Sequence, residues 1–122
     1  MSLPKLSANQ LRRIEVIQGF LRTVDMVKRL VGDLEANRSA RPRVLEDLST
    51  RISRELSRMR QRALGSNIGT VADVAGGLST LAHRSQGLLM KIRGLHEGMA
   101  SLSLQLDRAM AIASTPEEQR QP

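Results

Sequence analysis

The chain has 122 residues, a length that suits one domain. It contains no cysteine and one aromatic residue, Phe20, which excludes disulfides and thiolate sites and argues against a sheet protein. Its 19 Lys and Arg residues and 12 Asp and Glu residues give a net charge of +7. This charge permits binding to nucleic acid, an anionic membrane or an acidic protein, but it selects none of them.

Two observations bear on where the protein resides. No apolar run approaches the roughly 18 residues that a membrane-spanning helix needs. The first ten residues, "MSLPKLSANQ", lack the order of charged, apolar and small residues that marks a signal peptide. We therefore expect a soluble, cytoplasmic protein.

A capping signal opens the first expected helix, which covers about residues 8–37. Ser7 is suited to cap this helix, and Gln10 follows three residues later, as in a capping box. Apolar residues then recur at steps of three and four and form a broad stripe. A stripe of this width indicates contact with two neighbouring helices.

The second expected helix covers residues 42–64, between Pro42, which suits a first turn, and Gly65, which suits a stop. Four arginines occupy an arc of about 80° on this helix, away from its apolar stripe. They are Arg51, Arg54, Arg58 and Arg62. Because arginine binds phosphate and carboxylate groups through paired hydrogen bonds, this Arg stripe is a candidate anion-binding surface. The alternative is a solvated face.

Three serines of the second helix also share a face, since Ser49, Ser53 and Ser57 are four residues apart. Small residues at this spacing allow another helix to approach closely. They are more often small polar surface residues, and we favour that interpretation.

A third helix is expected over residues 70–113, with Thr70 and Asp73 as a capping pair. Apolar residues alternate at steps of three and four along its length, which is typical of a helix–helix seam. The seam residues proposed to carry association are Val74, Leu78, Leu81, Leu88, Ile92, Leu95, Met99, Leu102 and Leu106.

These elements predict an all-α fold. We expect a three-helix, coiled-coil-like bundle with a long C-terminal helix in a single domain at 1–114, followed by a disordered tail at 115–122. A four-helix bundle is the alternative if the long helix breaks near Gly87–Gly98. Since the second helix is too short to cover an unbroken third helix, a second copy or a helical partner is expected to cover the rest.

The two histidines lie 13 residues apart, too far along one helix to share a metal ion. We therefore expect no metal site. The segment "LAHRSQGLL" at 81–89 resembles the H-box of HWE-type histidine kinases, although Gly87 stands where that family usually has Asn. The resemblance implies that His83 is a phospho-acceptor with Arg84 as its neighbour. Otherwise His83 is a solvated histidine.

No segment resembles a catalytic triad, a phosphate-binding glycine loop or a pair of catalytic carboxylates. We expect a non-enzymatic assembly or adaptor protein that acts through helix–helix association, with no cofactor and no small-molecule substrate. The first alternative is a basic module whose second helix binds nucleic acid or an anionic membrane. The second is phosphotransfer at His83.

Overall fold

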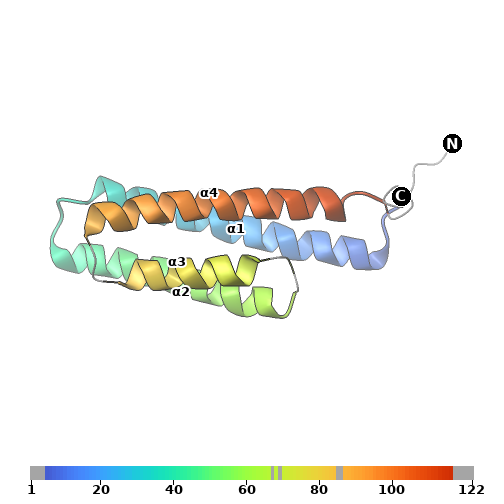
Figure 1. Cartoon of the computed structure of the whole chain (residues 1–122), viewed down its shortest axis with the longest axis horizontal. Helices are drawn as coiled ribbons and strands as arrows, with labels where there is room; N and C mark the ends of the chain where they lie inside the picture. Colours follow the sequence, from blue (N-terminus) through green and yellow to red (C-terminus); the bar gives the residue numbers. More distant parts are fainter. Residues whose placement is uncertain (1–4, 67, 69, 85–86, 117–122) are drawn as a thin grey trace.

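The computed structural model describes residues 5–66, 68, 70–84 and 87–116, which form four helices and no strand. The prediction of an all-α fold is confirmed. The helices are α1 (Ala8–Ala36), α2 (Pro42–Leu64), α3 (Val71–His83) and α4 (Leu88–Ala113). Successive helices run in opposite directions, so α1 begins and α4 ends at the same end of the bundle (Figure 1).

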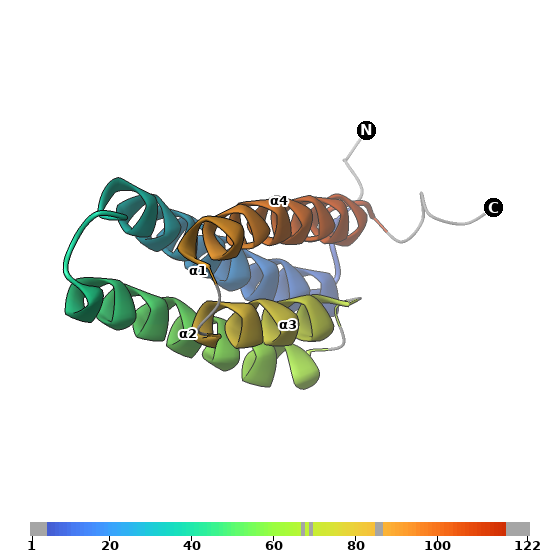
Figure 2. The same ribbon diagram turned by 60° about the vertical axis from the view of Figure 1, so that its left-hand side comes forward.

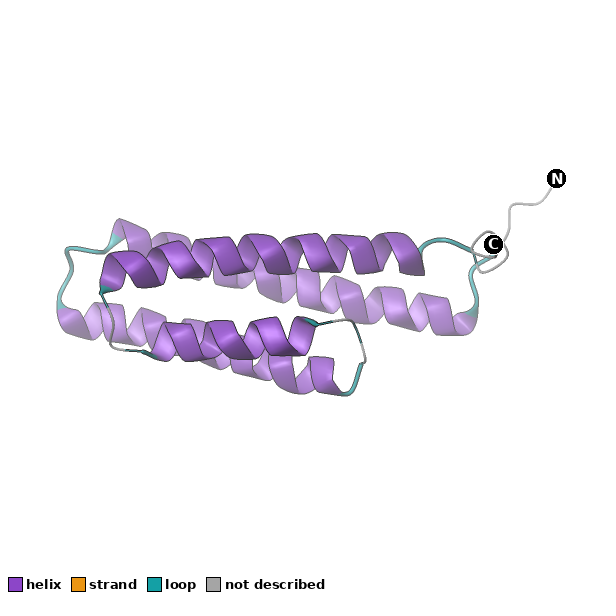
Figure 3. Ribbon diagram, in the orientation of Figure 1, coloured by secondary structure: helices purple, strands orange, loops and turns teal. Residues whose placement is uncertain are grey.

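The helices form two layers, with the pair α1 and α4 lying over the pair α2 and α3 (Figure 2). Each helix also contacts one helix of the other layer: α1 contacts α2, and α3 contacts α4. No Cα atoms of α1 and α3, or of α2 and α4, come within 8 Å of each other. The elements are joined by short connections (Figure 3), and the space enclosed by the four helices holds the core.

The core is built almost entirely from aliphatic side chains. Phe20 is buried with Ile17, Leu34, Ile52 and Leu95. Side chains of this size interdigitate in the narrow space between helices, where larger rings do not fit as readily. The broad stripe of α1 therefore contacts both α2 and α4, as its width predicts.

The capping box at the start of α1 is present and has a second role. Ser7 Oγ accepts from the Gln10 amide at 3.1 Å, and Gln10 Oε1 accepts from the Ser7 amide at 2.9 Å. Gln10 Nε2 also donates to the carbonyls of Ala113 at 3.4 Å and Thr115 at 2.7 Å. This buried side chain thus joins the start of α1 to the end of α4. The rest of the expected tail, 117–122, lies outside the described residues.

The expectation of one continuous helix over 70–113 is wrong. The helix ends at His83, and α4 begins at Leu88 after Gly87, while Ser85 and Gln86 lie outside the described residues. The reversal lets α3 fold back along α4 and cover its apolar side. Burial within one chain avoids the entropic cost of ordering a second one. The alternative break near Gly87 is therefore closer to the structure than the favoured unbroken helix.

Two glycines of α4, Gly94 and Gly98, explain how closely α3 packs. A Cβ atom at Gly98 would overlap the side chain of Leu78, and one at Gly94 would lie 2.6 Å from Leu81 Cδ2. The two glycines lie four residues apart, on one face of α4, and receive two leucines of α3. They are packing positions within a continuous helix, not breaks in it.

The start of α3 also differs from expectation. Thr70 precedes the helix, but its side chain makes no capping hydrogen bond there. Its hydroxyl lies 2.7 Å from Gln105 Oε1 of α4, to which it donates. Thr70 therefore bonds to a residue of another helix, instead of capping its own helix as the Thr70–Asp73 spacing predicts.

Candidate functional site

The two layers of the bundle differ in length. α1 and α4 have 29 and 26 residues, whereas α2 and α3 have 23 and 13. The connection from α2 to α3 therefore turns back before the start of α1 and the end of α4 (Figure 1). Beyond this turn, no other described helix lies on the side of α1 and α4 that α2 and α3 cover elsewhere (Figure 1).

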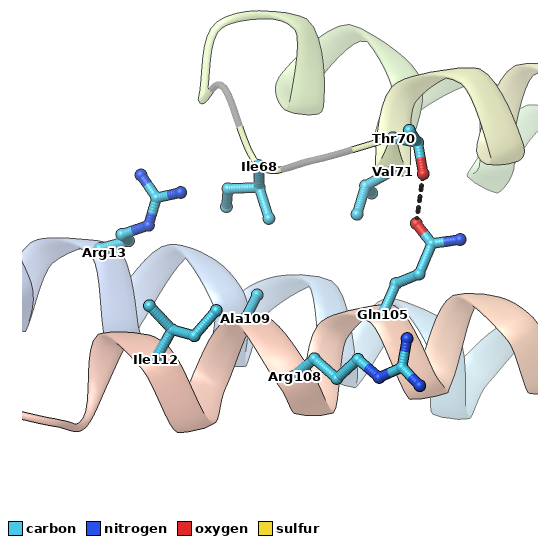
Figure 4. Close-up of a pocket in the computed structure, with 8 residues that line it drawn as sticks. All are labelled: Arg13, Ile68, Thr70, Val71, Gln105, Arg108, Ala109 and Ile112. Atoms are coloured by element: carbon cyan, nitrogen blue, oxygen red, sulfur yellow. Dashed lines mark hydrogen bonds between the residues drawn. The ribbon is translucent and has the colours of Figure 1, made fainter. Parts of the chain in front are cut away.

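A groove of about 320 Å³ lies at this step between the α2–α3 connection and α4. Figure 4 shows its lining side chains gathered from the connection, α3, α4 and α1. The apolar lining residues are Ile68, Val71, Ala109 and Ile112, and the polar ones are Arg13, Thr70, Gln105 and Arg108. We call this feature the end groove.

The floor of the end groove is buried, and its rim is exposed. Ile68 and Val71 are 3% and 1% exposed, so they belong to the core as well as to the groove. The hydrogen bond from Thr70 to Gln105 ties the connection to α4 beside them (Figure 4). Ile112, by contrast, is 57% exposed. An isoleucine this exposed beside a buried apolar floor is typical of a surface that receives an apolar group.

Sequence reasoning missed the end groove. Ile68 lies in a short connection and Ile112 lies off the predicted seam, so neither follows the period used to find association residues. The unequal lengths of the expected helices did indicate that part of the bundle is uncovered. Because α3 and α4 were expected to form one helix, the difference in length predicted an overhang of that helix instead of a groove.

The proposed seam residues lie in this chain's own core. Leu78, Ile92, Leu95, Met99, Leu102 and Leu106 are buried, and Val74, Leu81 and Leu88 are partly buried and pack against the core. The structure therefore covers them with the chain's own helices. They provide the packing of the fold, and the uncovered apolar surface lies elsewhere.

All four residues of the Arg stripe on α2 are exposed. Arg58 Nη1 lies 3.2 Å from Glu55 Oε1, an ion pair within the helix. The helix carries six arginines and three acidic residues, a net charge of +3. The structure thus keeps the candidate anion-binding residues together on one open surface, as their spacing predicts.

The serines of α2 do not lie on the free surface that we favoured. Ser53 Oγ lies 3.0 Å and Ser57 Oγ 2.7 Å from Ser79 Oγ of α3, and Ser79 Oγ donates to the Ser53 carbonyl at 2.9 Å. Ser49 is buried. Their small side chains let α2 and α3 approach closely, which was the less favoured interpretation.

The histidines lie on different helices. His83 is the last residue of α3 and is exposed, while His96 Nε2 of α4 lies 3.1 Å from Glu35 Oε2 of α1. Their separation along one helix therefore does not decide whether the two histidines could share a metal ion. Among the described residues, no group of three or more His, Asp or Glu side chains is placed to hold a metal ion. The role of His83 as a phospho-acceptor stays a prediction.

Within the described part of the chain, no helix combines the length and hydrophobicity needed to cross a membrane. Comparison with known proteins gives no match: no family model, curated protein or solved structure is significantly similar to this chain.

Proposed function

We propose that this chain is a non-enzymatic helical assembly or adaptor protein, a self-contained four-helix bundle that binds an apolar segment of another protein in the end groove. The observation that supports this most is the exposure of Ile112, at 57%, beside the buried floor of Ile68 and Val71. When a partner covers such a rim, apolar surface is removed from water, which stabilises the complex by about 25 cal/mol per Å² buried.

The partner segment that fits best is an amphipathic helix with acidic residues beside its apolar face. Arg108 places a positive charge at the groove, and the whole chain carries a net charge of +7. Two copies of so basic a chain repel each other, whereas an acidic partner is attracted during encounter. A short helix also supplies apolar anchors at steps of three and four residues, which suits an open groove.

The proposal is tested with peptides, since the partner's chemistry is specified. A displayed library of helical peptides is selected on the full chain, and the affinity of the selected peptides is measured by calorimetry. We expect peptides with apolar anchors and acidic flanks, and an affinity that falls at least tenfold for Ile112→Asp, which places a charge in the groove.

Met90→Asp is the matched control, because Met90 is 76% exposed on the same helix but does not line the end groove. It should leave the peptide affinity unchanged. The proposal fails if the two variants weaken binding equally, or if Ile112→Asp binds the peptides as the parent does.

A second candidate function is binding of an anionic polymer or membrane surface by α2. The exposure of Arg51, Arg54, Arg58 and Arg62 on the most basic helix favours it. Charge-driven binding to duplex DNA or to vesicles with anionic lipids should weaken steeply as salt rises, because released counterions dominate its free energy. Replacing three of these arginines by Gln should abolish it. Binding that is insensitive to salt would exclude this function.

A further inference from the structure

A second cavity, of about 280 Å³, lies where α3 ends and α4 begins, against the first half of α2. It is separate from the end groove and is not used by the function proposed above. Its polar lining residues are Glu46, Ser49, Thr50, His83, Arg84 and Lys91. Three of these six carry or can carry positive charge, two of them at the end of α3 and one near the start of α4.

Lys91 is the unusual member of this set. It is only 9% exposed, and no hydrogen bond or ion pair joins its ammonium group to any residue that the structure describes. Burial lowers the pKa of Lys91, because an ammonium group loses hydration inside the protein. A lysine side chain this little exposed loses part of its hydration, and an anion beside its ammonium group would offset that loss.

The start of α4 adds to the positive character of the cavity. Gly87 precedes the helix and has no side chain that could cap it. The first amide groups of a helix have no acceptor within the helix, and they form the positive end of its dipole. Leu88, the first residue of α4, and Arg84, the residue that follows α3, both line the cavity. An oxyanion in this cavity would lie near both the start of α4 and the Lys91 side chain.

We propose that this cavity binds a small phosphate, either inorganic phosphate or a small phosphate monoester. Lys91 supplies a charge from a side chain that is mostly buried, Arg84 binds the anion from the surface, and the amides at the start of α4 donate hydrogen bonds to it. The hydroxyls of Ser49 and Thr50 are free to donate as well, since neither makes a hydrogen bond to the described residues. This proposal does not depend on the end groove.

Glu46 provides an internal check on the charge balance. It is the acidic residue among the lining residues, and no nitrogen of Lys91 or Arg84 lies within 4.0 Å of its carboxylate. A bound phosphate and this carboxylate repel each other. Glu46→Gln should therefore tighten phosphate binding, because it removes the negative charge that repels the anion.

The test uses the full chain and inorganic phosphate, with glycerol 3-phosphate in a parallel arm. Calorimetry measures the affinity, and thermal unfolding is followed at constant ionic strength as phosphate replaces chloride. We expect saturable binding of at least one of the two compounds and a rise in melting temperature. Arg84→Gln should weaken binding roughly tenfold.

Lys91→Met is the decisive variant, with Lys28→Met, at an exposed position of α1, as its matched control. Lys91→Met should melt higher than the parent without phosphate and gain nothing when phosphate is added, whereas Lys28→Met should respond as the parent does. A rise of equal size in Lys91→Met would show a general salting effect and overturn the proposal. Failure of both compounds to bind the parent would also overturn it.

Discussion

Gly98 fixes the distance between α3 and α4, because Leu78 occupies the space that a Cβ atom would fill. We predict that Gly98→Ala lowers the free energy of unfolding by about 1–3 kcal/mol, as in other overpacked cores. Gly77→Ala in α3 is the matched control, since nothing lies within 4 Å of its Cβ position. It should raise stability by up to about 1 kcal/mol, because alanine favours helix. Urea unfolding of both variants measures the contrast, and equal effects would contradict this packing.

Lys91 predicts a pH dependence of stability whose sign follows from its burial. Its pKa lies below the ordinary value of 10.5 in the folded chain, so the unfolded chain binds the proton more tightly. Stability therefore rises with pH between the lowered pKa and 10.5, and the cost of burying the charge is full below that window. Glu46, His83 and Arg84, the other charged or titratable groups of the cavity, remain in both proteins that are compared.

Lys91→Met removes this cost, so it should be more stable than the parent at pH 7, in chloride buffer. Its advantage should shrink as pH approaches 10.5. Urea unfolding of both proteins at pH 7 and pH 10 measures the difference. An advantage that grows with pH would contradict the direction of the shift.

At the scale of the element, Gln10 closes the open end of the bundle by joining α1 to α4. Gln10→Ala removes the side-chain acceptor of the Ser7 amide and the donor to the carbonyls of Ala113 and Thr115, so it should cost about 1–2 kcal/mol. Gln18→Ala, at an exposed position of the same helix, is the control. Amide hydrogen exchange should accelerate at the start of α1 and at the end of α4 in Gln10→Ala, and at neither place in Gln18→Ala. Exchange that accelerates only within α1 would contradict the link.

The elements also show which signals a sequence carries. The capping box of α1 and the limits of α2 depend on neighbouring residues, and both were predictable. The break after His83 was not, because Leu81 and Leu88 keep the seven-residue step across it and the apolar register gives no warning. The serines of α2 gave no warning either, because Ser79, the partner of Ser53 and Ser57, is distant in sequence. The break after His83 and the contacts of the serines both depend on which helices pack against each other. The apolar period of a single helix carries no information on that packing.

At the scale of the whole molecule, the two layers of unequal length leave an apolar groove open at one end of the bundle. Most of the predicted seam, including Leu95 and Leu102, is buried inside the bundle, and the rest packs against the core. Leu95→Asp should therefore unfold the chain, since an unpaired carboxylate would enter the core. Circular dichroism would show this loss of helix. A folded Leu95→Asp variant would mean that the seam is not the core.

The chain covers its predicted seam with its own helices, and the end groove is the apolar surface that we propose binds a partner. The most direct test is the solution mass by light scattering at low and moderate salt. We predict a monomer of 13.5 kDa under both conditions, because the seam needs no second chain and the net charge opposes self-association. A stable dimer that persists at moderate salt would contradict the account, since apolar surface that the structure covers would then be shared between copies.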